Sequence, residues 1–309
     1  MPASRLPEFV VVADEIAHAL RRGLPVVALE SAVISHGLPH PVGIETTSAL
    51  EAEVRAAGAI PATVAVVDGR IVVGLDAAGY SRLTDSAVWK VAERDLAVAV
   101  TSRATGGTTV SATIAVAATV GVSVMSTGGI GGVHLDADWT WDVSADLQAL
   151  ARHSVIVVSA GAKAICDIGK TLEFLDTTGV TVAAYGSGRF PNFYVADSGF
   201  DAPRRIDRPA EAAAILRHKR ALRQEGAVLV TNPIPAEDAL TSDEVARAVA
   251  AAQARIGPLR GGDLTPALLA ALGEISGGRT LRANVALLRA NARLAAAIAR
   301  EAAQESLRA

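Results

Sequence analysis

Short apolar segments alternate with amphipathic ones along most of the chain. Apolar runs rich in β-branched residues are typical of buried strands, and apolar positions repeating at helical spacing are typical of helices that cover a sheet. We therefore expect strands at 25–30, 96–100, 122–126, 154–161, 180–186 and 227–232. We expect helices at 13–22, 44–57, 143–152, 162–179 and 209–224, another that begins near 106–110, and a mostly helical remainder at 242–256, 264–272 and 278–305.

One hairpin interrupts this alternation. Residues 62–75 are typical of two strands joined at Asp68-Gly69, a dipeptide that favours a tight turn. Strands alternating with helices indicate βαβ units and a largely parallel sheet covered on both faces. We therefore predict an α/β fold, a three-layer α/β/α arrangement with a largely parallel mixed sheet, the β-hairpin and a helical C-terminal third. No long linker or repeat divides the sequence, so we predict a single domain over residues 1–309.

Composition narrows the class of function. The net charge is −3 and 20% of the residues are charged, which is not the basic footprint of a nucleic-acid-binding protein and favours a small-molecule partner. The apolar run near the N-terminus is broken by Asp14 and Glu15, so we expect no signal peptide, and no apolar stretch is long enough to predict a membrane span. The one cysteine, Cys166, fits a reducing compartment, and we expect a cytoplasmic protein.

Lysine is rare in this sequence, with Lys90, Lys163, Lys170 and Lys219 among 29 basic residues. Lysine can lose its proton in an apolar environment and arginine cannot. Lys163 follows a predicted strand near an expected helix start, where burial and the helix N-terminus both favour the neutral amine that forms imines. A structural or phosphate-binding role for Lys163 is equally compatible with the spacing. Lys90 is typical of a solvated helix lysine or of a point charge for a phosphate.

Several polar residues directly follow predicted strands. Ligands collect at the carboxyl ends of the strands in open α/β sheets, so Glu30, the 127–134 loop, Lys163 and Asn232 are expected to share one site. Burial at the end of an apolar strand would raise the pKa of Glu30 toward the range that acid–base catalysis uses, although a helix cap or salt bridge would also explain this residue. For Asn232, beside two prolines, we favour a turn over a ligand contact.

Two glycine-rich segments are candidate ligand loops. Residues 106–110, GGTTV, open an expected helix whose backbone N–H groups, with Thr108 and Thr109, would suit a phosphate. The segment TGGIGGVH (127–134) lacks both the G-x-G-x-x-G spacing and a Walker lysine, which makes dinucleotide binding a poor interpretation. It favours a close backbone approach to a ligand, or simply a tight turn.

Four aspartates gather at Asp136, Asp138, Asp142 and Asp146, and hard divalent cations prefer such carboxylates. Asp142 and Asp146 are four residues apart and would share a face of a helix, although Asp142 also suits a helix N-cap. The histidines show no zinc spacing, and Cys166 is expected to be a small buried residue.

Taken together, eight collinear blocks between about 25 and about 295 resemble the pseudouridine-5'-phosphate glycosidase family. They are VVALESAVISHG (26–37), KVAERDL (90–96), GGTTVSAT (106–113), TGGIGGVH (127–134), DVSADLQ (142–148), SAGAKAICDIG (159–169), NPIP (232–235) and TLRANVALLRANA (280–292). The resemblance implies an α/β/α fold, a homotrimer, and reversible cleavage of the C–C glycosidic bond of pseudouridine 5'-phosphate to uracil and ribose 5-phosphate.

The resemblance also implies a role for individual residues. Lys163 matches the nucleophile that forms a Schiff base, Glu30 the acid–base proton donor, and Asp142 the ligand of a divalent metal, usually Mn²⁺, with one ion per subunit. Substrate contacts are implied for Lys90, Val110, Ser144, Ala145 and Asp146, and further site residues for Thr109, His134 and Asn284.

The sequence departs from the family pattern at three positions. Gly43 stands where an asparagine is usual, Leu135 where a basic residue is common, and Trp139 where a more polar residue is found, and these changes bear on phosphate or base contacts. Two other functions compete with the glycosidase: another lysine-imine phosphosugar lyase or aldolase, and a non-catalytic sugar-phosphate binding protein. The second of these would be expected to have lost Glu30 or Lys163, and both are present.

Overall fold

Parallel strands form the centre of the molecule. The computed structural model describes residues 6–85, 87–256 and 264–308, and within them the strands form one 11-stranded sheet. Its parallel part runs in the order β3 (Ile60–Val67), β2 (Val26–Leu29), β7 (Val124–Ser126), β8 (Ile156–Ser159), β11 (Val228–Thr231), β9 (Thr181–Tyr185) and β10 (Arg205–Ile206). Strands β2, β7, β8 and β11 are buried at every position, as expected for apolar strands covered on both faces.

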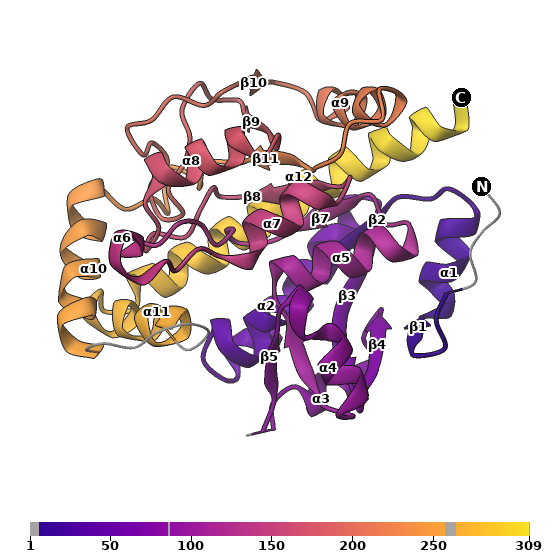
Figure 1. The fold of residues 1–309 in the computed structure, drawn as a ribbon, viewed down its shortest axis with the longest axis horizontal. Coiled ribbons are helices and arrows are strands. Elements are labelled where there is room, and N and C mark those ends of the chain that lie inside the picture. Colours follow the sequence, from indigo (N-terminus) through magenta and orange to yellow (C-terminus); the bar gives the residue numbers. More distant parts are fainter. Residues whose placement is uncertain (1–5, 86, 257–263, 309) are drawn as a thin grey trace.

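Helices cover the sheet on both sides, which confirms the predicted three layers (Figure 1). Helix α12 (Arg279–Arg308) packs against β2, β7 and β8 and lies between α2 (Val42–Ala56) and α9 (Pro209–Ala221). On the other face α5 (Val110–Val120) packs against α7 (Ala145–Arg152), which in turn contacts α8 (Ile168–Thr177). Fully buried alanines of α12, including Ala292, Ala295 and Ala296, let this helix approach the sheet closely.

The predicted hairpin is present and extends the sheet at one edge. Strand β3 pairs antiparallel with β4 (Arg70–Val73), and the connecting Asp68 and Gly69 have positive φ values of 49° and 77°. Two positive φ values are what a tight primed hairpin turn requires. Beyond β4, strand β1 (Val10–Val12) adds a parallel pair, while β6 (Gly106–Thr108) pairs with β3 and with β5 (Trp89–Val91).

Two predictions between residues 96 and 110 are wrong. Residues 96–100 belong to helix α4 (Leu96–Thr101), which follows the short turn η2 (Glu93–Asp95), and are not a strand. Only Ala99 is fully buried and Val98 is 53% exposed, so this apolar run faces the core on one side, as a helix can. Gly106–Thr108 is strand β6, not the opening of a helix, and α5 begins at Val110.

The expected helix at 162–179 begins later than predicted, at Ile168. The side chain of Asp167 accepts a hydrogen bond from the backbone N–H of Lys170 and caps the helix. Residues before it pair instead with the glycine-rich loop, through bridges between Ile130 and Ala162 and between His134 and Cys166. Lys163 therefore precedes a turn closed by the hydrogen bond from the Cys166 N–H to its carbonyl oxygen, five residues before α8, and the expectation that it stands near a helix start is wrong.

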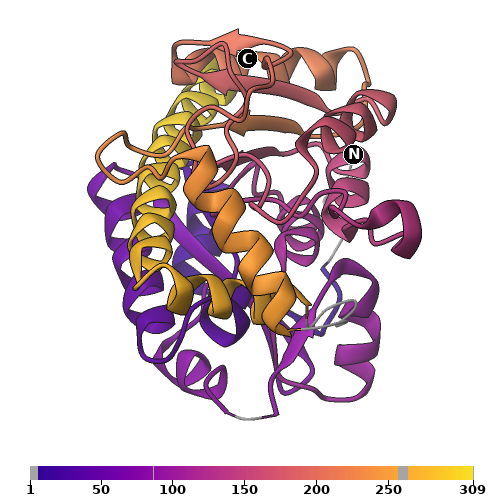
Figure 2. The same cartoon turned by 90° about the vertical axis from the view of Figure 1, so that its left-hand side faces the viewer.

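The C-terminal third is helical, as predicted. It contains α10 (Ser242–Ile256), α11 (Leu264–Ile275) and α12, and Figure 2 looks onto α10, which packs against α11. The remaining helices are α1 (Asp14–Arg21), the π-helical turn η1 (Val33–Gly37), α3 (Ala77–Arg82) and α6 (Ala137–Thr140). No helix in the described ranges is long and apolar enough to cross a membrane.

The hairpin turn gives a first test of the fold. A Cβ at Gly69 would lie 2.7 Å from Cα of Arg103 and 2.8 Å from the carbonyl oxygen of Val100, both backbone atoms. We expect Gly69→Ala to lower the free energy of unfolding by about 3 kcal/mol, from left-handed strain and overpacking together. Gly179 also has a positive φ but open space around it, so Gly179→Ala should cost only about 1 kcal/mol. Urea denaturation of both variants measures the difference, and equal losses would contradict the steric part of this argument.

Candidate active site

Residues that follow four neighbouring parallel strands meet at one edge of the sheet. Glu30 follows β2, Thr127 follows β7, Lys163 comes after β8, and Asn232 follows β11. A cavity at this edge is lined by Glu30, Lys90, Gly128, Gly129, Lys163 and Asn284 among others. The predicted convergence is therefore confirmed for Glu30, the glycine-rich loop and Lys163. Asn232 is not a lining residue, and its amide N–H donates to Oδ1 of Asn291.

A second cavity of about 540 Å³ adjoins the first and shares His36, Lys90 and Lys163 with it. Its lining includes the predicted residues Thr109, His134, Asp142, Ser144, Ala145 and Asp146. Val110 lines neither cavity, and its side chain is buried in the core, so any ligand contact at this position goes through the backbone. The two cavities form one elongated site with Lys163 and Lys90 at the junction.

Glu30 has the electrostatic character of an acid–base group. Its burial raises the pKa above the ordinary value, while the positive charges of Lys163 and Lys90 and a hydrogen bond from Thr127 oppose this effect. The hydroxyl of Thr127 donates to Oε1 of Glu30. A carboxyl group whose pKa is raised in this way holds a proton closer to neutral pH, as general acids require.

Lys163 is held by its backbone, which leaves the side chain to the cavity. Its N–H donates to the carbonyl oxygen of Ile130 at 2.9 Å, and its own carbonyl accepts from Cys166 at 2.9 Å. The side chain is half-buried between the two cavities, and its charge reaches Glu30. Burial raises the pKa of Cys166 to about 12, which agrees with its expected role as a small buried residue. Lys90 is half-buried on β5, and so it is not a solvated helix lysine.

Asp146 ties the glycine-rich loop to the start of α5. Its two carboxylate oxygens accept hydrogen bonds from the backbone N–H groups of Ser111 at 2.9 Å and Gly131 at 2.8 Å, and the residue is 5% exposed. Ser144 is the N-cap of α7, and Asp142 lies before the helix. The predictions that Asp142 and Asp146 share a helical face, or that Asp142 is the cap, are therefore wrong.

Asp142 lies beside His134 at the edge of the second cavity. Oδ2 of Asp142 is 3.8 Å from Nδ1 of His134, and the His134 backbone N–H donates to the carbonyl oxygen of Asp142. Burial lowers the pKa of His134, although Asp142 and Asp136 oppose the shift, and this favours the neutral imidazole.

The donor set around Asp142 is small. Among the residues that the structure describes, no group of three or more His, Cys, Asp or Glu side chains is arranged to hold a metal. Asp138, another member of the acidic cluster, pairs with Lys170 at 2.8 Å. A single carboxylate nevertheless suits a hard divalent ion that keeps its waters and binds substrate oxygens. Asp142 fits that mode of binding.

The predicted phosphate cradle at 106–110 is not formed as expected, because the backbone N–H of Thr108 donates to the hydroxyl of Ser31 at 3.0 Å and that of Thr109 to the carbonyl oxygen of Val91 at 2.9 Å. The hydroxyl of Thr108 is buried and donates to the carbonyl oxygen of Val64 at 2.6 Å, so it is not available to a ligand. Thr109 lines the second cavity, with its hydroxyl 3.0 Å from that of Ser111.

Two residues that contribute to the site were not singled out individually from the sequence, although Thr127 belongs to the 127–134 loop that was expected there. His36, in η1, lines both cavities, and its Nδ1 is 2.7 Å from the hydroxyl of Ser35. Thr127, the donor to Glu30, is buried at the start of the glycine-rich loop. Thr127 directly follows β7, which is the signal that could have found it, whereas His36 lies in η1, seven residues after the end of β2, and has no such local signal.

The three departures from the family pattern have different surroundings. A Cβ at Gly43 would lie 3.0 Å from both Cα and the carbonyl oxygen of Ile34, so a larger residue there requires the backbone to shift. Leu135 and Trp139 are 45% and 90% exposed. They lie on a loop whose base is closed by a bridge between Val133 and Val143, beside the second cavity.

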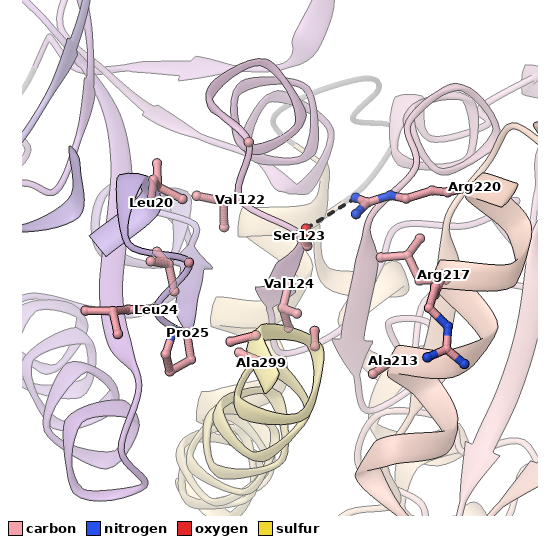
Figure 3. A pocket seen from close by; sticks show the side chains of 16 residues that line it. Leu20, Leu24, Pro25, Val122, Ser123, Val124, Ala213, Arg217, Arg220 and Ala299 are labelled. Atoms are coloured by element: carbon pink, nitrogen blue, oxygen red, sulfur yellow. Dashed lines mark hydrogen bonds between the residues drawn. The ribbon is translucent and has the colours of Figure 1, made fainter. Parts of the chain in front are cut away.

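A separate hollow of about 400 Å³ lies at the amino ends of β2 and β7, opposite the candidate site (Figure 3). Its lining is mostly apolar and includes Leu24, Val124 and Ala299. Arg220 at its rim donates to the hydroxyl of Ser123 and to the carbonyl oxygen of Ser154. None of the predicted site residues lies there, so this hollow is not part of the candidate active site.

The chain matches a known family over most of its length. The family described as Indigoidine synthase A like protein matches residues 15–301. The pseudouridine-5'-phosphate glycosidase of a Nocardioides species is 49% identical over 295 residues, which cover 94% of this chain and 96% of the relative. That of Deinococcus radiodurans is 46% identical over 303 residues, which cover 97% of each chain.

Two solved structures share the fold. The prealnumycin C-glycosynthase AlnA, in complex with ribulose 5-phosphate, superposes with a TM-score of 0.90 at 35% identity and covers 98% of this chain and 100% of its own. An indigoidine synthase A-like protein from Thermotoga maritima has a TM-score of 0.89 at 32% identity, with 97% and 99% covered.

The buried Asp146 provides a test of the site's architecture. Asp146→Asn replaces one acceptor oxygen by an amide that faces a backbone N–H, and we expect a loss of about 1–3 kcal/mol in the free energy of unfolding. Asp138→Asn is the matched control, because Asp138 is 66% exposed and its ion pair with Lys170 contributes little. Chemical denaturation of both variants measures the loss, and a fully stable Asp146→Asn protein would show that the two N–H groups do not depend on the carboxylate.

Proposed function

Since the chain belongs to the pseudouridine-5'-phosphate glycosidase family, whose members are enzymes, we propose that it cleaves the C–C glycosidic bond of pseudouridine 5'-phosphate. The products are uracil and ribose 5-phosphate, and the reaction is reversible. The observation that supports this proposal most is the meeting of Glu30 and Lys163 in one cavity, with Lys90 beside them. Both residues implied as catalytic are thus within reach of one ligand.

Lys163 supplies the nucleophile in the proposed reaction. Its neutral amine forms a bond to C1′ as the C1′–O4′ bond breaks and the ring oxygen takes up a proton, which leaves an open-chain amine still joined to uracil. The nitrogen lone pair then forms the C1′=N imine as the C1′–C5 bond breaks, uracil leaves with the electron pair on C5, and that carbon takes up a proton. Water hydrolyses the imine and places its oxygen on C1′, so that one water is consumed for each ribose 5-phosphate released.

Glu30 moves the proton. Its raised pKa favours a proton on the carboxyl group near neutral pH, the Thr127 hydroxyl donates to Oε1, and the charge of Lys163 acts on the same group. An ordinary two-carboxylate glycosidase protonates a leaving oxygen, and a carbon leaving group offers none. A lysine and one acid–base group therefore suit this bond better than a pair of carboxylates.

The remaining implied residues bind the substrate. Lys90 provides a positive charge for the phosphate, and Thr109, Ser144, Ala145 and Asn284 line the space around it. Asp146 acts mainly by holding the backbone of Ser111 and Gly131. Asp142, with His134 nearby, would hold one divalent ion, Mn²⁺ in our proposal, which when bound would neutralise charge on substrate oxygens.

We also propose that the enzyme is a cytoplasmic homotrimer that acts on small molecules, with neither nucleic acid nor membrane as a partner. The near-neutral net charge of −3 supports the exclusion of nucleic acid.

Borohydride trapping tests the nucleophile. Incubation with ribose 5-phosphate followed by reduction should attach one sugar phosphate to Lys163, detected by mass spectrometry of peptides. Lys163→Arg should give no adduct and no turnover while the fold persists, because the guanidinium stays protonated. Glu30→Gln should lower turnover by about 10²–10⁴-fold.

Three outcomes separate the alternatives. An adduct with turnover of ketose phosphates but not of the C-nucleotide would favour a lyase or aldolase. Binding of ribose 5-phosphate without any adduct would favour a non-catalytic binding protein. An adduct on a different lysine, such as Lys90, would overturn the assignment of Lys163.

Metal removal tests the role of Asp142. Dialysis against EDTA should reduce turnover and Mn²⁺ should restore it, whereas Asp142→Asn should bind the ion more weakly and need more Mn²⁺ for the same rate. Elemental analysis and Mn²⁺ titration by electron paramagnetic resonance measure binding independently of activity. Asp138→Asn serves as the control, and equal Mn²⁺ affinity in both variants would remove Asp142 from the metal site.

A further inference from the structure

A buried asparagine of α12 supports the start of the glycine-rich loop. Asn291 is 0% exposed, and its amide Nδ2 donates to the carbonyl oxygens of Thr127 at 2.8 Å and Gly128 at 3.2 Å. These two carbonyls stand where β7 leaves the sheet and enters the site. Both N–H groups of the amide are therefore used on one short segment of backbone.

Asn232 fixes the orientation of that amide. Its own Nδ2 donates to Oδ1 of Asn291 at 3.1 Å, while its backbone N–H donates to the carbonyl oxygen of Ser159 at 2.8 Å. Because two carbonyls face one side of the Asn291 amide, that side must carry the nitrogen, and the oxygen must face Asn232. A flipped Asn291 amide would place its oxygen against the two carbonyl oxygens and its nitrogen against the donor Nδ2 of Asn232. Each asparagine thus determines how the other is oriented.

The chain of contacts continues to the catalytic carboxyl group. The Thr127 backbone N–H donates to Val158 at 3.0 Å, and Asn291 holds the Thr127 carbonyl, so the peptide groups on both sides of this residue are fixed. The Thr127 hydroxyl then donates to Oε1 of Glu30. Figure 1 shows α12 running past β7 and β8. This packing brings Asn291, late in the sequence, to the carboxyl end of β7.

We propose that Asn291, oriented by Asn232, is a positioning residue for Glu30 and acts through Thr127. The inference rests on the proposed function for its kinetic consequences, since Glu30 is the acid–base group of that reaction. It also assigns a role to Asn232, which the sequence pattern suggested was a turn residue. Neither asparagine lines the two cavities of the site, so neither is a substrate contact.

The electrostatic consequence has a definite sign. The groups that act on Glu30 are Lys163 and Lys90, which favour its ionised form, Asp146, which disfavours it, and the Thr127 hydroxyl, which favours it. Loss of the Thr127 hydrogen bond would remove one of the interactions that lower the pKa of Glu30. Burial and the negative charge of Asp146, which raise this pKa, would remain. The pKa of Glu30 would then rise further above its ordinary value.

The test substitutes each asparagine and compares a helix control. Asn291→Asp preserves size but turns an oxygen toward the two carbonyls. We expect kcat for pseudouridine 5'-phosphate to fall about 10- to 100-fold with KM within about threefold, because Glu30 is misplaced and not the substrate. The limb of the kcat–pH profile that reports Glu30 should move to higher pH. Asn232→Ala should also lower kcat and move this limb of the profile to higher pH, with smaller changes than Asn291→Asp.

Leu294→Ala is the matched control on the same helix. Leu294 is buried and takes no part in the relay, so the substitution should lower Tm while leaving kcat and the pH profile unchanged. Wild-type kcat and pH profile in a folded Asn291→Asp protein would overturn the inference. If Asn291→Asp does not fold, an unchanged profile in Asn232→Ala would overturn it equally.

A titration that needs no turnover separates this inference from the proposed function. Infrared difference spectra across pH report the protonation of Glu30, with Glu30→Gln identifying its band. The band should titrate at higher pH in Asn291→Asp than in the wild type, and an identical titration would contradict the relay. If the wild type fails to cleave pseudouridine 5'-phosphate, the proposed function fails, and this titration still decides the positioning role.

Discussion

Parallel pairing of β2, β7, β8 and β11 is the constraint on which the site depends. Neighbouring parallel strands end at the same edge of the sheet, so the residues after one strand come within reach of the residues after its neighbour. Glu30, Thr127 and Lys163 come from distant parts of the sequence and meet only for this reason. A change of register by one residue would turn each side chain to the opposite face and separate the acid from the amine.

The site's chemistry results from a balance between burial and charge. A carboxyl group at the end of a buried strand is expensive to ionise, and a lysine nearby reduces that cost without removing it. The glycine-rich loop next to these two residues is held by hydrogen bonds from two different helices. Asp146 holds the middle of the glycine-rich loop from α7, and Asn291 holds its beginning from α12. The reacting groups are thus carried on backbone whose polar atoms are already bonded to the protein.

The sequence predicted the parallel strands, the hairpin and most of the site, because buried strands and the Asp68-Gly69 turn have local signals. The predictions from the sequence were wrong where the local structure depends on contacts with distant residues. The five residues 96–100 are as apolar as a strand, and only the packing of Ala99 against the core shows that they are helical. The non-helical conformation of residues 162–166 depends on bridges to residues more than thirty positions earlier in the chain. The roles of Asn291 and Asp146 depend on which distant backbone groups they meet, which no spacing within the sequence expresses.

Helix α12 follows all the strands of the described residues in the sequence, yet it contacts β2, β7 and β8, and its Asn291 donates to the backbone that follows β7. A fragment that lacks α12 would leave the Thr127 and Gly128 carbonyls without the Asn291 amide and one face of β2, β7 and β8 without the helix that covers it. The candidate site therefore cannot be reproduced by its strands and loops alone, and its geometry is a property of the assembled domain.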